Sequence, residues 1–447
     1  MENDLFEKTP VPKAFFKFAL PVVLSMVVSL VYNMVDTYFI AQTGNTNLVA
    51  GVSISAPVFT LMIALGDIFG LGGSSVISRL FGEKRDEDGR RLSVFCFYAA
   101  LLCGFVVTAV MLLFRSPILH LLGADRETMS YASGYYTYIV LGAPFIILSL
   151  TPSNLLRTEG FATASMAGSI LGAVVNMILD PIFISVLGLG AAGAAIATVI
   201  GNIFADIFYV WFLLRKSRRL SINPAGFHIH IVEVGQILAI GIPASVTNLM
   251  QSMGIALTNR YLLPYGNDKV AAMGIVMKVN LIAVLVLIGF AFGAQPLIGY
   301  NYGAKNHARL KEILRFCYGF ECCTAAVLAG VLCLAAPALI GIFMQDASII
   351  AVGVPMLRMQ QMGMVFTAVV LVTTCTFQSA GKAVGAFLLS VSRQGVLFAA
   401  VLLIASKVFH YNGVLMAQAV SDLLTAILAV ILFDILIRRK MGREQMH

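Results

Sequence analysis

The sequence predicts an all-α membrane protein with twelve transmembrane helices in two pseudo-symmetric six-helix lobes. Three observations support this fold class: the composition, a series of long apolar segments, and an internal duplication. Of the 447 residues, 59% are hydrophobic and 12% are charged, and the mean hydropathy is +0.90. Soluble domains carry roughly 25% charged residues. The composition therefore excludes an ordinary soluble fold.

Twelve apolar segments are long enough to cross a bilayer, which takes about 20 helical residues. The first segment is too long for the core of a signal peptide and has no clear cleavage site, so we interpret it as a retained helix. The segments span residues 17–42, 52–78, 92–114, 131–153, 161–187, 190–214, 236–262, 271–299, 313–340, 351–377, 383–406 and 412–437.

The distribution of basic residues predicts the orientation of these helices. With both termini in the cytoplasm, 22 of the 30 lysines and arginines fall on the cytoplasmic side and four on the outer side. Cytoplasmic loops of membrane proteins carry such an excess. The net charge of +8 thus follows from topology and does not indicate nucleic-acid binding. We expect a multi-pass protein of a bacterial cell (plasma) membrane.

The two halves of the chain repeat each other at a nearly constant shift. Pro21 recurs 222 residues later as Pro243, and Gly72 recurs 221 residues later as Gly293. Six spans per copy make a parallel repeat, an arrangement that suits alternating access. The sequence therefore divides into an N-lobe at 1–215, a cytoplasmic linker at 216–235 and a C-lobe at 236–447.

Two acids, Asp36 and Asp180, lie inside apolar segments of the first half. An intramembrane acid is costly and suggests a functional site. At about 1.5 Å of rise per residue, these acids, Asn176 and Thr198 lie roughly 9–16 Å below the outer ends of three helices. Pro181 cannot donate a backbone hydrogen bond and should loosen the helix beside Asp180. Four oxygen-bearing side chains are thus expected in one layer.

This layer indicates a site for a coupling cation. A carboxylate in hydrocarbon is neutralised by a proton or needs a cation, and hard cations prefer oxygen ligands. An organic cation is an alternative occupant, and hydrogen bonding between helices is an alternative role. The predicted sodium or proton site consists of Asp36, Asn176, Asp180 and Thr198.

Candidate substrate contacts lie in both halves. In the first half, Tyr32 and Asn33 lie four and three residues before Asp36 and are expected on its face of the helix. Tyr135 opens the fourth segment, and an interfacial aromatic belt is a competing explanation for it. In the second half, methionines offer an adaptable lining, and plain helix packing is the competing explanation. The candidates are Tyr32, Asn33, Asp36, Tyr135, Met250, Gln251 and Met253.

Other charged residues also fall inside apolar segments. Asp206 is expected to meet Arg157, with a structural role as the result. In the second half, Lys278 and Asp422 lie at similar depths and are expected to neutralise each other. Asp67 has no obvious partner.

The sequence lacks the signatures of an enzyme. It contains no Gly-x-x-x-x-Gly-Lys-Ser/Thr phosphate loop, and the seven cysteines match no metal or disulfide spacing. No nucleophile–His–acid set is visible. We therefore expect no catalytic activity and no cofactor, with an ion gradient as the source of energy.

Several motifs follow one another along the chain: Ala19-Leu20-Pro21, Gly72-Gly73-Ser74-Ser75, Asn176-x-x-x-Asp180-Pro181, Gln295-Pro296 through Lys305, and Gly413 through Gln418. These motifs resemble the multidrug and toxic compound extrusion (MATE) family. The resemblance implies sodium- or proton-driven export of lipophilic, often cationic drugs, and it implies an N-lobe cation site at the four residues of the acid layer. Segments 7 and 10 carry no acid, which makes the chain more similar to MepA-like or DinF-like branches than to NorM-like ones.

The leading hypothesis is a secondary active transporter that exports lipophilic cationic drugs or toxic compounds by antiport with sodium ions or protons. The alternative is a flippase or exporter of lipid-linked precursors or small metabolites, for which Lys278 and Arg393 would serve an anionic headgroup. The expected partners are the lipid bilayer and drug-like small molecules, not nucleic acid, and we expect a monomer.

Overall fold

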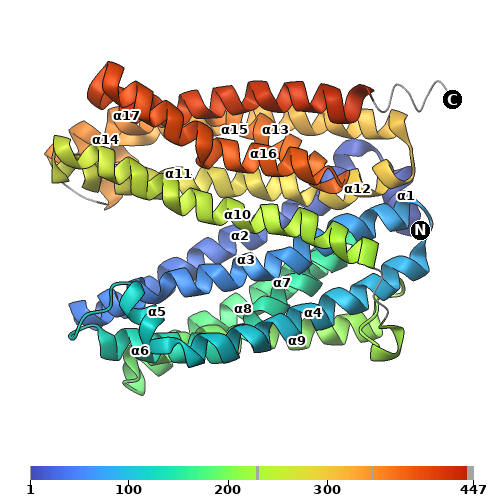
Figure 1. Cartoon of the computed structure of the whole chain (residues 1–447), viewed down its shortest axis with the longest axis horizontal. Coiled ribbons are helices and arrows are strands. Elements are labelled where there is room, and N and C mark those ends of the chain that lie inside the picture. Colours follow the sequence, from blue (N-terminus) through green and yellow to red (C-terminus); the bar gives the residue numbers. More distant parts are fainter. Residues whose placement is uncertain (1, 228–230, 344–345, 440–447) are drawn as a thin grey trace. The chain divides into compact units, whose positions relative to one another are not determined.

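The computed structural model describes residues 2–227, 231–343 and 346–439, and within these ranges it contains helices and no strand (Figure 1). The first half forms α1 (Glu2–Glu7), α2 (Val11–Gln42), α3 (Thr46–Gly82), α4 (Asp86–Leu113), α5 (Arg115–Leu121), α6 (Met129–Leu141), α7 (Ala143–Thr158), α8 (Ala162–Pro181) and α9 (Gly190–Arg215). The second half forms α10 (Ile231–Leu262), α11 (Asn267–Gly293), α12 (Gln295–Gly303), α13 (His307–Phe343), α14 (Ala347–Gln361), α15 (Met364–Ser379), α16 (Ala383–Gln394) and α17 (Val396–Phe433). The predicted all-α fold class is confirmed.

The helices agree with twelve membrane crossings. Among the described residues, nine helices are long and apolar enough to span a bilayer, and two further spans are bent pairs, α6 with α7 and α14 with α15. The stretch Ala383–Arg438, which includes α16 and α17, has 56 residues, or about 84 Å at 1.5 Å per residue. It therefore holds two spans, which are separated by the non-helical backbone of His410 (φ 51°, ψ −125°).

Two compact units divide the chain. The first contains Leu24–Gly241, and the second contains Phe6–Val23 together with the chain from Ile242 onward. Helices α2 and α10 each contribute residues to both units. The division within α2 lies next to Pro21, and the division within α10 lies next to Pro243. These two units thus exchange within α2 and α10, at positions different from the linker predicted at 216–235.

The start of that predicted linker packs on the first unit. The backbone N–H groups of Arg218 and Arg219 donate to Glu159 Oε1 at 2.7 and 3.1 Å. Ser221 N–H donates to Ser93 Oγ of α4 at 2.9 Å. Residues 228–230 of the predicted linker lie outside the described residues.

The two bent spans break at equivalent glycines, Gly142 and Gly363, which are 221 positions apart. The bends measure 51° and 45°. A Cβ at Gly142 would lie 2.1 Å from Cγ2 of Val199 in α9, and a Cβ at Gly363 would lie 3.0 Å from Cα of Ala419 in α17. In each unit, the absence of a side chain at the bend lets the helix pack closely on its neighbour.

Candidate cation-binding site

The helix beside Asp180 is irregular, as Pro181 predicted. The α-helix α8 ends at Pro181, and residues Ile182–Val186 form a π-helix, in which Leu187 N–H donates to Ile182 O at 2.8 Å. Such π-turns occur frequently at functional sites. Asp180 itself has no exposed surface, so the widened turn adjoins a fully buried acid.

Asn176 joins Asp180 to α9. In one orientation of its amide, the Asn176 NH₂ group donates to Asp180 Oδ2 and its oxygen accepts from Thr198 N–H, each at 3.2 Å, so both amide atoms have a partner. In the opposite orientation, its NH₂ group lies 3.3 Å from both Asp180 Oδ1 and Thr198 Oγ1. Either orientation brings three of the four predicted site residues together, and all three are buried.

Asp36 of α2 completes the layer. It is close enough to Asp180 for direct electrostatic interaction, and its Oδ1 is buried with no hydrogen-bond partner among the described residues. Neither acid forms an ion pair with a lysine or arginine in the part of the chain that the structure describes. Two neighbouring carboxylates without a basic partner leave their negative charge to be balanced by a proton or a cation.

Two tyrosines adjoin the acids. Tyr135 is 7% exposed and lies within electrostatic range of Asp36, Asp180 and Tyr32. Its position beside the acids differs from that of an exposed interfacial belt, which Tyr138 fits better at 42% exposure. Tyr32 lies within range of both acids.

The remaining substrate candidates are divided between the two units. Asn33 is exposed and donates to Ser29 O at 2.6 Å. Met250, Gln251 and Met253 belong to the second unit. A Cβ at Gly395 would lie 2.8 Å from Met250 Sδ, which indicates packing, while Met253 is 54% exposed. A substrate site that combines the two sets stays a prediction.

The donor atoms of the layer are oxygens, the kind that hard cations prefer. The described residues contain no group of three or more His, Cys, Asp or Glu side chains that would hold a metal ion. The layer instead offers two carboxylates, an amide and a hydroxyl. Oxygen ligands of this kind suit hard cations, and the unpartnered Asp36 Oδ1 provides a free acceptor.

The prediction that Lys278 neutralises Asp422 is wrong. Asp422 pairs with Arg393 at 2.9 Å between Oδ1 and Nε, and it accepts hydrogen bonds from Thr367 and Gln418 at 3.0 Å each. Lys278 is exposed on α11 and has no ion-pair partner among the residues described. The error arose because depth along a helix says nothing about which face a side chain occupies.

The expected contact between Asp206 and Arg157 is not formed. Arg157 donates to Asn154 Oδ1 and interacts electrostatically with Asp67 of α3. Asp206 is 6% exposed, and neither of its carboxylate oxygens has a hydrogen-bond partner within the described ranges.

Sequence reasoning missed one acid. Glu321 in α13 is 1% exposed, and both of its carboxylate oxygens lack a hydrogen-bond partner among the described residues. Glu321 could have been found in the same way as Asp67, because each is an acidic residue inside an apolar segment of the sequence. The second unit therefore contains a buried, unpaired acid that no family motif marks.

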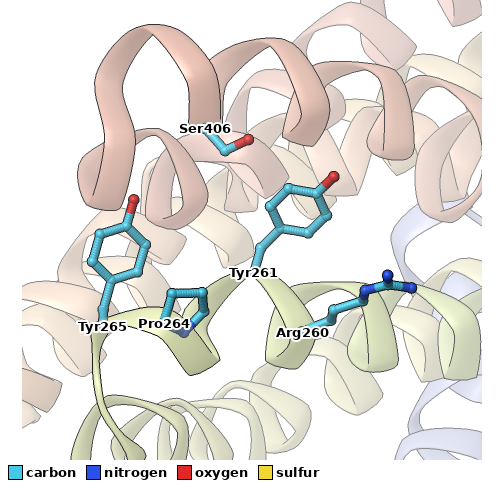
Figure 2. Close-up of a pocket in the computed structure, with 5 residues that line it drawn as sticks. All are labelled: Arg260, Tyr261, Pro264, Tyr265 and Ser406. Atoms are coloured by element: carbon cyan, nitrogen blue, oxygen red, sulfur yellow. The ribbon is translucent and has the colours of Figure 1, made fainter.

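A surface pocket lies in the second unit, without any of the candidate residues. Figure 2 shows Arg260, Tyr261, Pro264 and Tyr265 around the end of α10, with Ser406 of α17 opposite. Its volume is about 290 Å³. No predicted function is attached to it.

Comparison with known proteins supports the duplication and the resemblance. The MatE family model matches residues 21–182 and again residues 243–404, two stretches separated by the shift of 222 found in the sequence. The chain is 30% identical over 377 residues to the multidrug export protein MepA of Staphylococcus saprophyticus, covering 84% of this chain and 83% of that protein. It is also 30% identical over 382 residues to MepA of Staphylococcus aureus, with the same coverage.

Solved structures share the fold. A crystal structure of MATE in the straight conformation matches with a TM-score of 0.93 at 24% identity, over 99% of both chains. A MOP superfamily transporter from Pyrococcus furiosus, described by the reverse polarity of its binding pocket, matches with a TM-score of 0.90 at 24% identity, over 98% of this chain and 97% of that one. The predicted similarity to MepA-like proteins is confirmed by the sequence relatives.

Proposed function

Because the chain belongs to the MatE family of multidrug and toxic compound extrusion (MATE) proteins, we propose that it is a secondary active transporter that exports lipophilic cationic drugs in exchange for sodium ions or protons. The observation that carries this proposal is the pair of carboxylates, Asp36 and Asp180, which interact with each other and have no described basic partner. The relatives are multidrug export proteins, which supports the same class of substrate.

The chemistry of the pair explains how an ion would drive export. Without a proton or cation, the two neighbouring carboxylates repel each other, so the empty layer is unfavourable. A coupling ion or a cationic drug relieves this repulsion, and the two therefore compete for the same negative charge. Competition between ion and drug is the requirement for antiport, because each must leave before the other binds.

The flippase alternative is weaker than the sequence suggested. It depended on Lys278 and Arg393 as cationic contacts for an anionic headgroup. Arg393 forms an ion pair with the buried Asp422. Lys278 is therefore the one remaining residue of the two that support the flippase alternative. Translocation of lipid headgroups in liposomes would favour this alternative over drug export.

Ethidium efflux from proteoliposomes tests the proposal. A sodium gradient and a pH gradient are imposed one at a time on the full chain. We expect one gradient to drive efflux, and we expect Asp36→Asn and Asp180→Asn each to abolish it while the protein still enters the membrane. Full efflux by both variants, or none from the unaltered chain under either gradient, would overturn the proposal.

A matched control is available in Asp434→Asn. Asp434 is partly exposed and forms weak contacts with Arg438 and Arg439 at 3.5 and 3.0 Å. Exposed pairs of this kind contribute about 0–1 kcal/mol to stability. The same Asp-to-Asn change outside the acid layer should therefore leave efflux intact.

We further propose that the chain is a monomer in the bacterial plasma membrane, with both termini in the cytoplasm. The 22 to 4 distribution of basic residues supports this orientation. Fusions of a reporter that is active only in the cytoplasm to each terminus would test it, and an inactive fusion at either end would contradict it.

A further inference from the structure

A row of polar side chains runs along α9 from the cation site toward the predicted cytoplasmic end of this helix. Thr198, Asn202 and Asp206 are spaced at i, i+4 and i+8, so they share one face of the helix. At about 1.5 Å per residue, Asp206 lies roughly 12 Å beyond Thr198. The row starts at Thr198, which is bonded to Asn176 of the cation site.

Hydrogen bonds connect the middle of the row to neighbouring groups. Asn202 Nδ2 donates to Thr198 O at 2.9 Å, and Asn202 Oδ1 accepts from Ser149 Oγ of α7 at 3.0 Å. Polar groups thus continue without an apolar break from the cation site to the turn before Asp206.

Hydroxyl groups also continue beyond Asp206. Tyr209, three residues later, donates to Ser165 O at 2.8 Å, and its hydroxyl lies 3.0 Å from Ser169 Oγ. Ser165 Oγ in turn lies 3.0 Å from Ser153 Oγ. These side chains belong to α7, α8 and α9, so a polar network occupies the space between three helices.

Asp206 is the acid of this row, and it has no partner of its own. Both carboxylate oxygens are buried without a hydrogen bond among the described residues. The ionisable group that interacts with it is Tyr209 on α9, and Tyr209 also interacts with Arg157 on α7, which acts on Asp67 of α3. Burial of an unpaired carboxylate is so costly that the group neutralises instead. A proton supplies that neutralisation with no change in the surrounding structure.

We propose that Asp206 is a second proton-binding carboxyl of the first unit, which accepts protons from the Asp36–Asp180 layer and releases them toward the cytoplasm. This inference rests on the proposed function and assigns its coupling ion as the proton. A proton leaves Asp206 for the cytoplasm, and the resulting carboxylate takes up a proton that is released from the layer and carried by water along the polar α9 row, because the Asn202 amide and the Thr198 carbonyl do not themselves transfer protons. Charge and protons balance at each step.

The corresponding row of the second unit lacks the acid, since Thr198 and Asn202 correspond to Ser421 and Thr425. At the shift of 223 that relates Gly190 to Gly413, Asp206 corresponds to Ala429. The nearby acid of α17, Asp422, is neutralised by Arg393. The proposed proton route therefore belongs to the first unit, which also holds the cation site.

Two transport modes of the full chain in liposomes test the inference. Export of radiolabelled tetraphenylphosphonium driven by a pH gradient requires net proton movement, whereas exchange of labelled for unlabelled tetraphenylphosphonium does not. We expect Asp206→Asn to slow gradient-driven export roughly a hundredfold or more, the range of a lost proton-transfer group, and to leave exchange unchanged. Asp206→Glu, which keeps the carboxyl group, should restore much of the driven rate.

Glu321→Gln is the matched control, since it neutralises an equally buried and unpartnered acid outside the row. It should leave both modes and their pH profiles unchanged. Equal loss of both modes in Asp206→Asn, or an unaltered driven rate, would overturn the inference. Export that responds only to sodium would also overturn it while leaving drug export intact, and export under neither gradient would instead refute the proposed function.

Discussion

Asn176 contacts both the Asp180 carboxylate on its own helix and Thr198 on α9, at 3.2 to 3.3 Å. One amide thus fixes the spacing between an acid and the helix that carries the polar row. The contact spans 22 residues of sequence and crosses the π-helix that follows Pro181. Asn176 thus connects two of the other three candidate residues, and we expect its loss to weaken ion binding more than it lowers stability.

Replacing Asn176 with alanine removes this connection. A hydrogen bond to a charged group contributes about 1.5–3 kcal/mol, so we expect the coupling-ion concentration for half-maximal efflux to rise roughly tenfold or more. Ion dependence of ethidium efflux measures the change. A lower maximal rate with an unchanged ion dependence would show that Asn176 acts only in folding.

Arg393→Ala should strongly destabilise the second unit. The variant leaves Asp422 buried without its cation, and breaking a buried pair costs about 3–5 kcal/mol. Thermal unfolding of the purified protein in detergent, followed by fluorescence, measures the loss. The double variant Arg393→Met with Asp422→Leu removes both charges and should recover most of the stability. A single variant as stable as the unaltered chain would contradict the pairing.

Gly142→Ala should destabilise the bend between α6 and α7. The new Cβ would lie 2.1 Å from Val199 Cγ2, and such overpacking costs about 1–3 kcal/mol. Val199→Ala should relieve the clash when the two changes are combined. Gly319→Ala is the control, because a Cβ there meets nothing within 4 Å. Equal melting temperatures for the two glycine variants would refute the close packing.

Asp125, in the loop before α6, should make stability depend on acidity. Hydrogen bonds from Thr128 and from the Glu127 backbone N–H hold the pKa of this carboxyl below its usual range. A lowered folded-state pKa stabilises the protein above the ordinary pKa, and this stability is lost as the pH falls through the lowered value. Asp125→Asn should flatten the fall in melting temperature on acidification. An identical pH profile in the variant would contradict this account.

Much of the fold followed from hydrophobic segment length and the internal repeat. The ends of α9, predicted at 190 and 214, differ from the structure by no more than one residue, because Gly190 and the basic cluster after Trp211 mark them. The change of unit inside α2 and α10 was not predictable, since it depends on packing between distant segments. The two bends at Gly142 and Gly363 were not predicted, because each lies inside a segment of the length of a single span.

The positions of the candidate residues were predictable only where their spacing along one helix determines which side chains lie together. Asn176 and Asp180 meet because four residues make one helical turn, and Thr198 joined them by depth. Depth alone failed for Asp422, whose partner Arg393 lies on the helix before it in the chain, and for Asp206, whose expected partner Arg157 acts on Asp67. Pairing depends on which helix faces meet, and a single sequence does not contain that information.

Equilibrium binding of tetraphenylphosphonium to the purified protein tests the central claim, that drug and ion compete for the carboxylates of the first unit. In the unaltered chain, raising the concentration of the coupling ion should weaken drug binding in proportion, and in Asp180→Asn the binding should no longer respond to the ion. Drug binding that is independent of both sodium and pH in the unaltered chain would contradict the account.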